Sequence, residues 1–431
     1  MKLINKYIFN FIFFIFLVLA IFNRPFVGIF IFKFRIGELL IALGLVITLL
    51  FLIFTIFFKK DKYLQSFSKL HILLVTTFFV SIYYFEGTFF NNYFYKSSSY
   101  IWTIGYIYMG FLIGNYVKLN ETHLRILKFT LILSYILKVY YYPKFLSEFF
   151  EIYSDKFQQS KATDLLAIFV VTIYFSNRIQ KESFNNFVYF VLITSYFLPL
   201  FIFMSKGSSI SVILFFFIEF FNQKIHWSKF NLKLIVLIVV AIILFFVSST
   251  FVLQNLSNID REDSNAFSAR NSIFELLSNK NTISTFFSVY LYEGRFYSTE
   301  GNLDWRLQIW QDVIFDLKNN DNLFFGYGFA NKIPAMENPD RVGKDGENEN
   351  VHNYFITVLA RGGLFQLIII FTIYVYIIKE FFEKFDNFQI IIYILPFLLS
   401  SMFDTSMESV QFPLIFFFFI GLQLSKTNDY Y

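Results

Sequence analysis

The sequence contains no cysteine, and only four of its 431 residues are histidines. Without cysteine the chain can form neither disulfide bonds nor thiolate metal sites. The histidines are scattered and form no ligand-spaced cluster, so we expect no metal ion and no cofactor. Charged residues are also scarce, at 16% of the chain, whereas soluble proteins carry about 25%. A soluble protein is therefore excluded, and the net charge of +5 is better explained by membrane orientation than by a nucleic-acid partner.

Long apolar runs occupy most of the chain instead, and 67 of its residues are phenylalanine. The runs have lengths close to the roughly 20 residues that a helix needs to cross a bilayer. The sequence therefore predicts an all-α, polytopic integral membrane protein that forms one integrated membrane domain. About twelve transmembrane helices are expected, at 7–22, 37–58, 70–85, 99–117, 126–142, 162–178, 184–204, 208–222, 234–252, 354–378, 388–403 and 410–424.

The orientation of these helices follows from the short loops between them, because basic residues tend to stay in the cytoplasm. Lys and Arg are enriched in alternate loops, which predicts cytoplasmic chain ends and an extracytoplasmic segment 253–352. Three basic residues of the first outer loop, Arg24, Lys33 and Arg35, are the exception. The first apolar run lacks a small-residue cleavage site, so we expect an uncleaved helix rather than a signal peptide.

The polar segment 253–352 separates nine expected helices in residues 1–252 from three in residues 353–431. It carries nine Lys or Arg and fifteen Asp or Glu, as a translocated loop can. Leu303–Asn319 predicts an amphipathic helix, and Phe325–Phe329 predicts a tight turn around two glycines. The apolar face of that helix is expected at Leu303, Leu307, Trp310, Ile314 and Leu317.

Two other outer segments, and one stretch within 253–352, have readable patterns. Pro143–Lys161 carries an apolar stripe suited to a helix lying in the membrane interface. Glu337–Asn350 is rich in turn formers and predicts a mobile loop. Asp404–Glu408 is a tight turn with two acids, of which Asp404 is a candidate carboxylate partner for the site. Solvated turn acids are the simpler interpretation of either residue alone.

His352 stands at the outer end of the tenth expected helix, and a histidine can accept or give a proton near neutral pH. A lone histidine at such a boundary more often caps a helix or binds a carbonyl. Here Glu349 precedes it, Asn353 follows it, and Arg361 lies about two and a half helical turns further on. These neighbours favour a functional His352, with Glu349, Asn353 and Arg361 in supporting roles, together with Trp310 of the expected loop helix.

Two basic residues could bind an anionic group. Arg306 lies on the expected loop helix, four residues before Trp310, and a guanidinium grips phosphate oxygens with two hydrogen bonds. A salt bridge to Asp304 or Asp312, or stacking on Trp310, is an equally good interpretation of Arg306. Lys206 follows a long apolar run at the same predicted outer face. Its alternative is a lysine that merely extends to the membrane surface.

Taken together, these motifs resemble the O-antigen ligase and polymerase superfamily of bacterial membrane glycosyltransferases, and the layout resembles a C-type membrane glycosyltransferase. The resemblance covers about Ser205 to Gly363. The motifs that carry it are Ser205-Lys206-Gly207, Arg306-x-x-x-Trp310, Phe325-Gly326-Tyr327-Gly328, His352-Asn353-Tyr354 and Arg361-Gly362-Gly363-Leu364.

The resemblance implies transfer of a glycan from an undecaprenyl diphosphate carrier to an acceptor hydroxyl, outside the cytoplasmic membrane of a bacterium. The implied partners are that donor, a glycan or lipid A–core acceptor, and membrane lipid. Arg306 matches a diphosphate-binding arginine, and His352 matches the histidine that assists acceptor activation. Lys206 stands where many members have arginine, which keeps the charge but loses the two-pronged geometry.

Several readings remain open at this stage. A ligase and a polymerase of this superfamily differ in their acceptor, and the sequence separates them poorly. A flippase or transporter of the lipid-linked glycan is the alternative from another class, although the chain shows no paired, interrupted repeat halves of the kind transporters favour. A relative that has lost activity is the third alternative.

Overall fold

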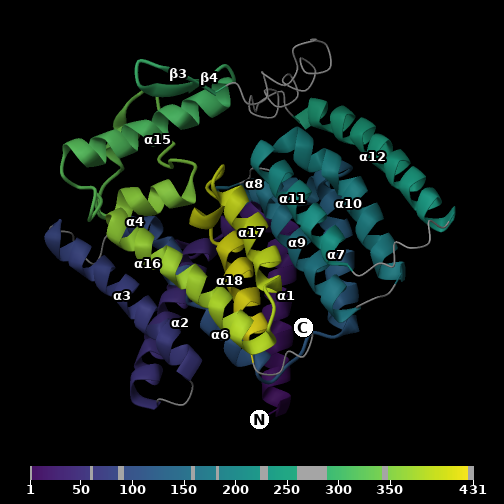
Figure 1. Ribbon diagram of the computed structural model, residues 1–431, viewed down its shortest axis with the longest axis horizontal. Coiled ribbons are helices and arrows are strands. Elements are labelled where there is room, and N and C mark those ends of the chain that lie inside the picture. Colours follow the sequence, from purple (N-terminus) through teal and green to yellow (C-terminus); the bar gives the residue numbers. More distant parts are fainter. Residues whose placement is uncertain are drawn as a thin grey trace.

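The computed structural model describes residues 2–58, 62–85, 92–156, 161–180, 184–223, 232–259, 289–341 and 348–425. It is a bundle of helices with a further helix, α15, lying across one end (Figure 1). The helices are α1 (Lys2–Val27), α2 (Ile36–Phe58), α3 (Lys62–Tyr84), α4 (Asn92–Ser97), α5 (Ser99–Thr103), α6 (Tyr106–Gly114), α7 (Glu121–Val139), α8 (Lys144–Tyr153), α9 (Ala162–Ile179), α10 (Phe184–Met204), α11 (Lys206–Asn222), α12 (Leu232–Ile259), α15 (Gly301–Asn319), α16 (Tyr354–Phe385), α17 (Gln389–Ser401) and α18 (Gln411–Leu424), with 3-10 turns η1 (Pro334–Glu337) and η2 (Ser406–Glu408).

Within the described residues, seven helices are long and apolar enough to cross a membrane: α1, α2, α3, α9, α10, α12 and α16. Each of the twelve expected ranges contains helix. In the five ranges without one of these seven helices, the helices are shorter or more polar. The range 99–117 holds two short helices, α5 and α6, instead of one. The chain is thus a polytopic helical membrane protein.

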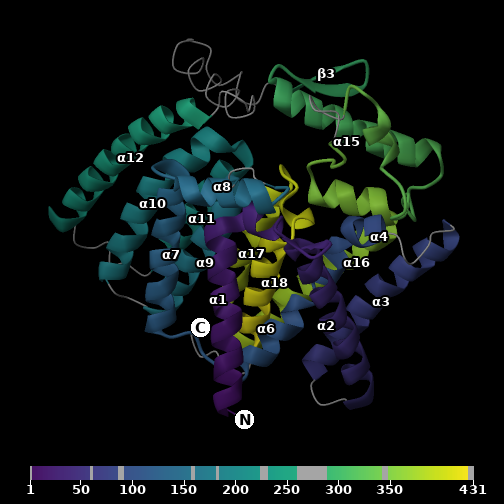
Figure 2. The same ribbon diagram turned by 180° about the vertical axis from the view of Figure 1, so that it is seen from behind.

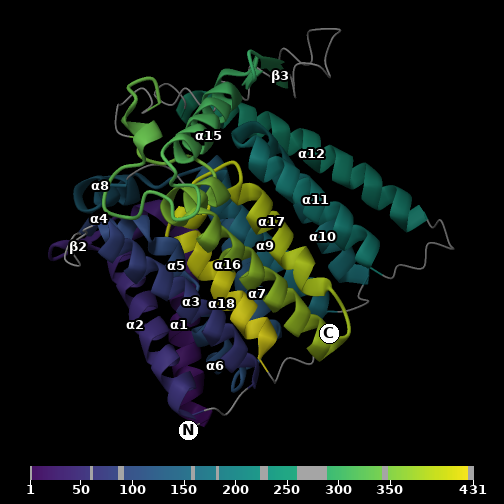
Figure 3. The ribbon, with the colours of Figure 1, turned by 60° about the vertical axis from the view of Figure 1, so that its left-hand side comes forward.

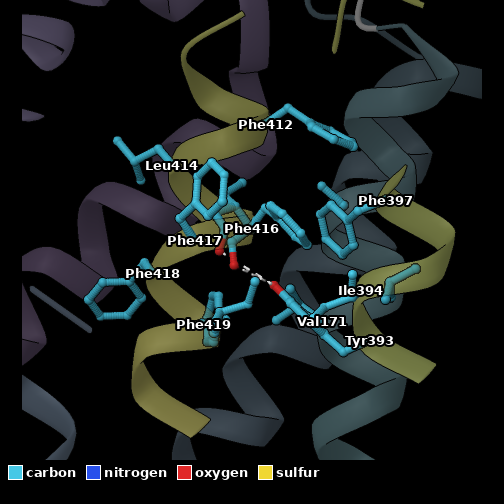
Figure 4. Packing of buried hydrophobic residues seen from close by; sticks show 14 of the residues in the cluster. Val171, Tyr393, Ile394, Phe397, Phe412, Leu414, Phe416, Phe417, Phe418 and Phe419 are labelled. Carbon is cyan, nitrogen blue, oxygen red and sulfur yellow. Dashed lines mark hydrogen bonds between the residues drawn. The ribbon is translucent and has the colours of Figure 1, made fainter. Parts of the chain in front are cut away.

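Helix α9 forms the centre of the bundle. Nearly all of its residues are buried, and it contacts α1, α7, α10, α11, α17 and α18. Beside it, phenylalanines of α18 interleave with Phe397 and Tyr393 of α17, and the Tyr393 hydroxyl donates to the Phe416 carbonyl (Figure 4). By contrast, α12 leaves apolar residues such as Val239 and Ile242 exposed, as a lipid-facing helix does.

Helices α6 and α18 approach each other at backbone distance. A Cβ added at Gly110 would lie 2.0 Å from the Phe418 carbonyl oxygen, and one added at Gly421 would lie 2.1 Å from the Ile107 carbonyl oxygen. Small residues allow this close approach, which drives helix association where water is absent.

Two small antiparallel hairpins interrupt the helices in the part of the chain that the structure describes, so the expectation of an entirely α-helical chain was incomplete. Strand β1 (Phe30–Ile31) pairs with β2 (Phe34–Arg35), and β3 (Val289–Tyr292) pairs with β4 (Arg295–Ser298). The second hairpin lies along α15, on its side away from the bundle (Figures 1 and 2). The strands of both hairpins are too short for the sequence pattern to separate them from loop.

Helix α15 confirms the helix expected at Leu303–Asn319, but its apolar face was predicted only in part. Ile309, Val313 and Leu317 are buried, whereas Ile314 is 43% exposed. The buried residues pack against Val351 and Leu359, next to and within α16. This cluster holds α15 across the end of the bundle, and Figure 3 shows the helix in that position.

The turn expected at Phe325–Phe329 is present and joins the loop to a kink in α16. Gly363 has φ 66° and ψ −170°, which breaks two helical hydrogen bonds, those from Leu364 to Ala360 and from Phe365 to Arg361. The four groups left over bind the loop instead. Tyr327 N donates to Ala360 O, Gly328 N to Arg361 O, Leu364 N to Leu323 O and Phe365 N to Phe324 O, at 2.7–3.3 Å.

Other outer segments are arranged around the same end. Part of the expected interfacial segment forms α8, which lies across the bundle near the end of α1 (Figure 2). Arg35 pairs with Asp155 beside it. In the segment expected to be a mobile loop, residues 337–341 and 348–350 are described, and residues 342–347 lie outside the described part of the chain.

Candidate active site

Arg306 lies on α15, whose first turn is held by Glu300. The Glu300 carboxylate accepts a hydrogen bond from the Leu303 backbone N–H at 3.2 Å and so caps the helix. The same carboxylate pairs with Lys206 Nζ at 3.2 Å. Because Lys206 begins α11, this ion pair joins the loop helix to the membrane helices and brings two predicted site residues to one end of the bundle.

The acids near Arg306 in sequence are bound elsewhere. Asp304 accepts a hydrogen bond from a backbone N–H of β4 at 2.8 Å. Asp312 pairs with Arg295 and Arg341, at 2.5 and 2.8 Å. Asp304 and Asp312 therefore do not provide the salt bridge along α15 that was the alternative interpretation of Arg306.

The guanidinium of Arg306 is partly buried, and its Nε has no hydrogen-bond partner among the described residues. Burial lowers the pKa of Arg306, while the nearby charges of Asp404 and Glu300 raise it. An arginine keeps its proton in proteins, so this group is a fixed cation with a donor to offer. Such a donor suits an incoming oxyanion.

His352 sits immediately before α16 with its backbone in the left-handed region, at φ 56°. Its ring contacts the edge of Trp305, with centroids 5.2 Å apart, and its Nε2 lies 3.3 Å from Asn348 Oδ1. Burial lowers the pKa of His352 to about 3, and the positive charges of Arg306 and Lys161 contribute. The ring is therefore neutral at physiological pH and can accept a proton.

Two predicted residues hold His352 in place. Trp310 Nε1 donates to the Val351 carbonyl at 2.7 Å. Asn353 caps α16, and its side chain accepts from the backbone N–H groups of Phe355 and Ile356 at 3.0 and 3.2 Å. The helix cap is thus Asn353, which leaves the imidazole of His352 available for another role.

Two other predicted residues support the loop rather than face the site. Arg361 is buried and donates to the carbonyls of Gly328 and Asn331 and to the Tyr93 hydroxyl. Glu349 pairs with Lys96 and Lys332, at 3.1 Å each. These contacts fasten both ends of the segment 328–349 to the bundle.

Asp404 is buried and belongs to a network that the sequence did not reveal. Its carboxylate pairs with Lys161 Nζ at 2.9 Å and accepts from the Thr163 hydroxyl at 2.9 Å. Burial alone would raise the pKa of Asp404, but Lys161 and Arg24 outweigh it and hold that pKa well below its usual range. Arg24 also lies 3.9 Å from Asp164. Charged residues at both ends of an apolar run were the available signal.

The turn 403–408 touches the first turns of three helices. Thr163 of α9 binds Asp404, Thr357 of α16 donates to Glu408 at 2.5 Å, and a Cβ on Gly207 of α11 would lie 2.7 Å from Phe403 Cβ. A helix N-terminus carries partial positive charge. Three such ends, together with the cations nearby, create an environment that favours a bound anion.

The arrangement has the parts of a group-transfer site that acts on an anion. A neutral histidine stands near Arg306 and Lys161, whose charges act on it. Among the described residues, no three His, Asp or Glu side chains are grouped to hold a metal ion.

Comparison with known protein families gives one match, to the family described as O-antigen ligase, over residues 190–371. This range includes Lys206, Arg306, His352 and the kink at Gly363. No curated protein matches the chain.

Proposed function

Because this chain belongs to the O-antigen ligase and polymerase superfamily, we propose that it transfers a glycan from an undecaprenyl diphosphate carrier to an acceptor hydroxyl. The family supports glycan transfer in surface polysaccharide biosynthesis. The carrier, the acceptor and the residues that act on them are the proposal.

The observation that carries this proposal is the meeting of Arg306 and His352 at one end of the bundle. Arg306 is a partly buried cation whose Nε has no partner among the described residues, and its charge acts on His352. Lys206 reaches the same region through Glu300. A diphosphate is the kind of ligand that would displace Glu300 from Lys206 and occupy the Arg306 donor.

The chemistry divides between these residues. The acceptor hydroxyl gives its proton to His352, and its oxygen bonds to the anomeric carbon of the donor. The bond from that carbon to the diphosphate oxygen breaks, and the leaving diphosphate takes the electron pair. Arg306 and Lys206 stabilise the charge that develops on it. Losing one such contact costs about 3 kcal/mol in the barrier, or a factor of about 100 in rate.

The proposed topology has twelve spans, both chain ends in the cytoplasm and the site at the periplasmic face of the inner membrane. Support comes from contacts between segments that share a predicted side. Arg24 meets Asp164, Lys161 meets Asp404, and Lys96 meets Glu349. The chain lacks cysteine, so single cysteines introduced at Lys318 and Lys379 can report the side of each by labelling with a membrane-impermeant reagent. Only the cysteine at position 318 should react in cells whose outer membrane has been permeabilised and whose inner membrane is intact.

The central test is electrophoresis of surface glycans from a deletion strain that carries single variants. Arg306→Ala and His352→Ala should each abolish transfer while the protein still inserts in the membrane. Lys318→Ala, which removes an exposed cation from the same helix, is the matched control and should behave as wild type. Normal glycan profiles in both site variants would reject the assignment.

The same gels separate the alternatives. Core that carries one repeat unit in the deletion strain would indicate a polymerase. Carrier-linked polymer beside bare core would indicate a ligase. Unchanged glycans combined with a transport defect would favour a flippase, and no change of any kind would favour a non-catalytic relative.

A further inference from the structure

The side chain of Asn348 has a defined orientation beside His352. Its Oδ1 accepts a hydrogen bond from the Asn350 backbone N–H at 3.3 Å, and its Nδ2 donates to the Asn350 carbonyl at 3.1 Å. Turning the amide over would place two donors face to face and two acceptors face to face. The hydrogen-bond pattern therefore assigns the oxygen of Asn348 to the side that faces His352.

That oxygen determines where His352 carries its proton. Asn348 Oδ1 lies 3.3 Å from His352 Nε2, and an amide oxygen can only accept. Nε2 must then be the protonated nitrogen. In a neutral imidazole the other nitrogen carries a lone pair, so Nδ1 is the basic atom of His352.

Nδ1 is also the nitrogen that the fold leaves open. It is buried and has no hydrogen-bond partner in the described part of the chain. Trp305 packs against the same ring, and Trp310 donates a hydrogen bond to the carbonyl of Val351, the residue before His352. A buried acceptor without a partner is costly, and such groups persist where a substrate supplies the missing donor.

We propose that Asn348 is a positioning residue that selects the Nε2–H tautomer of His352, so that Nδ1 receives the proton of the acceptor hydroxyl. The inference rests on the proposed function, because it names the atom that accepts this proton. The O–H bond of the acceptor breaks, an N–H bond forms at Nδ1, and the ring becomes an imidazolium. Asn348 then keeps its hydrogen bond, because Nε2 remains a donor in both states.

An amide and a carboxylate at position 348 would differ in their effect on the basicity of His352. Burial and the nearby cations lower the pKa of His352. An aspartate would also orient the ring, and its charge would raise that pKa. The asparagine fixes the tautomer without adding a charge.

The first experiment reads the tautomer directly, without activity. Full-length protein with ¹⁵N-labelled histidine is reconstituted in lipid, and its imidazole signals are recorded by solid-state NMR. His352→Gln identifies the signal of His352 among the four histidines. The wild type should show protonated Nε2 and bare Nδ1, and Asn348→Leu should populate the other tautomer. Protonated Nδ1 in the wild type would overturn the inference.

The second experiment measures glycan transfer in membranes. Asn348→Ala should lower the turnover rate about 10- to 100-fold, as loss of a histidine-orienting partner does, with little change in KM for the donor. Asn348→Asp should restore part of that rate and move the acidic limb of the pH profile upward. Asn338→Ala is the control, since Asn338 makes a similar local hydrogen bond, to the Asp340 backbone N–H, in another part of the loop.

The two experiments separate the inference from the proposed function. If His352→Ala transfers glycan normally, the proposed function fails, whatever the tautomer. If His352→Ala is inactive but Asn348→Ala matches the wild type in rate and in NMR signal, the positioning role of Asn348 is wrong and the proposed function stands.

Discussion

Gly363→Ala tests the contact between the loop and the membrane helix that holds the site together. The backbone at Gly363, with φ 66° and ψ −170°, is one that residues with a side chain rarely adopt. A Cβ there would lie 2.2 Å from the carbonyl carbon and oxygen of Phe324. The substituted chain can keep the kink and accept the strain, or straighten α16 and release the loop.

Both routes have a cost that the structure sets. Keeping the kink costs about 1–3 kcal/mol in backbone strain, before the overlap with Phe324 is relieved. Straightening α16 regains two helical hydrogen bonds but loses the four to the loop, a net cost of about 2 kcal/mol. It also frees Phe329, now 1% exposed, which adds about 2 kcal/mol. We expect a loss of roughly 3–4 kcal/mol in unfolding free energy by whichever route is cheaper.

The assay is thermal unfolding of the purified protein in detergent, followed by tryptophan fluorescence, since Trp305 and Trp310 of α15 are two of the four tryptophans. Large chains lose about 2 °C in midpoint per kcal/mol, so a shift of several degrees is expected, together with loss of glycan transfer. Gly301→Ala is the control, because a Cβ at Gly301 meets nothing within 4 Å. A Gly363→Ala protein that melts and transfers like the control would refute the role assigned to the kink.

Three other predictions follow from the contacts. Gly421→Ala should force α6 and α18 apart and lower the unfolding free energy by about 1–3 kcal/mol; the same melting assay checks it, and an unchanged midpoint would contradict the close approach. Lys206→Arg should retain glycan transfer whereas Lys206→Ala should lose most of it, because the proposed diphosphate site needs the charge; wild-type activity in Lys206→Ala would remove Lys206 from the site. Burial raises the pKa of Glu408 from 4.5 to about 7, so the folded state holds a proton that the unfolded state releases between these values, and stability falls as pH rises through that window. Glu408→Gln should therefore match the wild type near pH 4.5 and exceed its stability above pH 7, by at most about 3 kcal/mol; melting curves at both pH values provide the comparison.

The candidate residues differ in how well the sequence could assign their roles. Asn353 and Arg361 were expected to support His352. The structure shows Asn353 as a helix cap, which needs only the adjacent turn of α16. Arg361 is a clamp on the loop, and its partners Gly328 and Asn331 lie far along the chain. Glu349 stood three residues before His352, yet its carboxylate binds Lys96 and Lys332. Proximity in sequence did not predict the direction of a side chain.

Other features had a visible signal that the pattern could not complete. The charges of Lys161 and Asp164 at the start of an apolar run are readable, but their partners Asp404 and Arg24 come from distant segments. The buried face of α15 is rotated by part of a turn from the predicted one. In a mostly polar helix the sequence pattern is compatible with more than one buried face, and the residues that pack against the helix determine which face is buried.

The sequence by itself determined the class of molecule, because apolar runs without charge can only be stable as helices in lipid. It also determined the turn, since Phe325-Gly326-Tyr327-Gly328 has few other conformational uses, whereas the kink at Gly363 was not predicted. Only the tertiary structure decided that these two segments bind each other, that Arg306 is left without the acids beside it, and that Asn348 faces His352. Those outcomes depend on which surfaces the buried cores of α9 and α15 bring together, and long-range packing of that kind is not encoded in any local pattern.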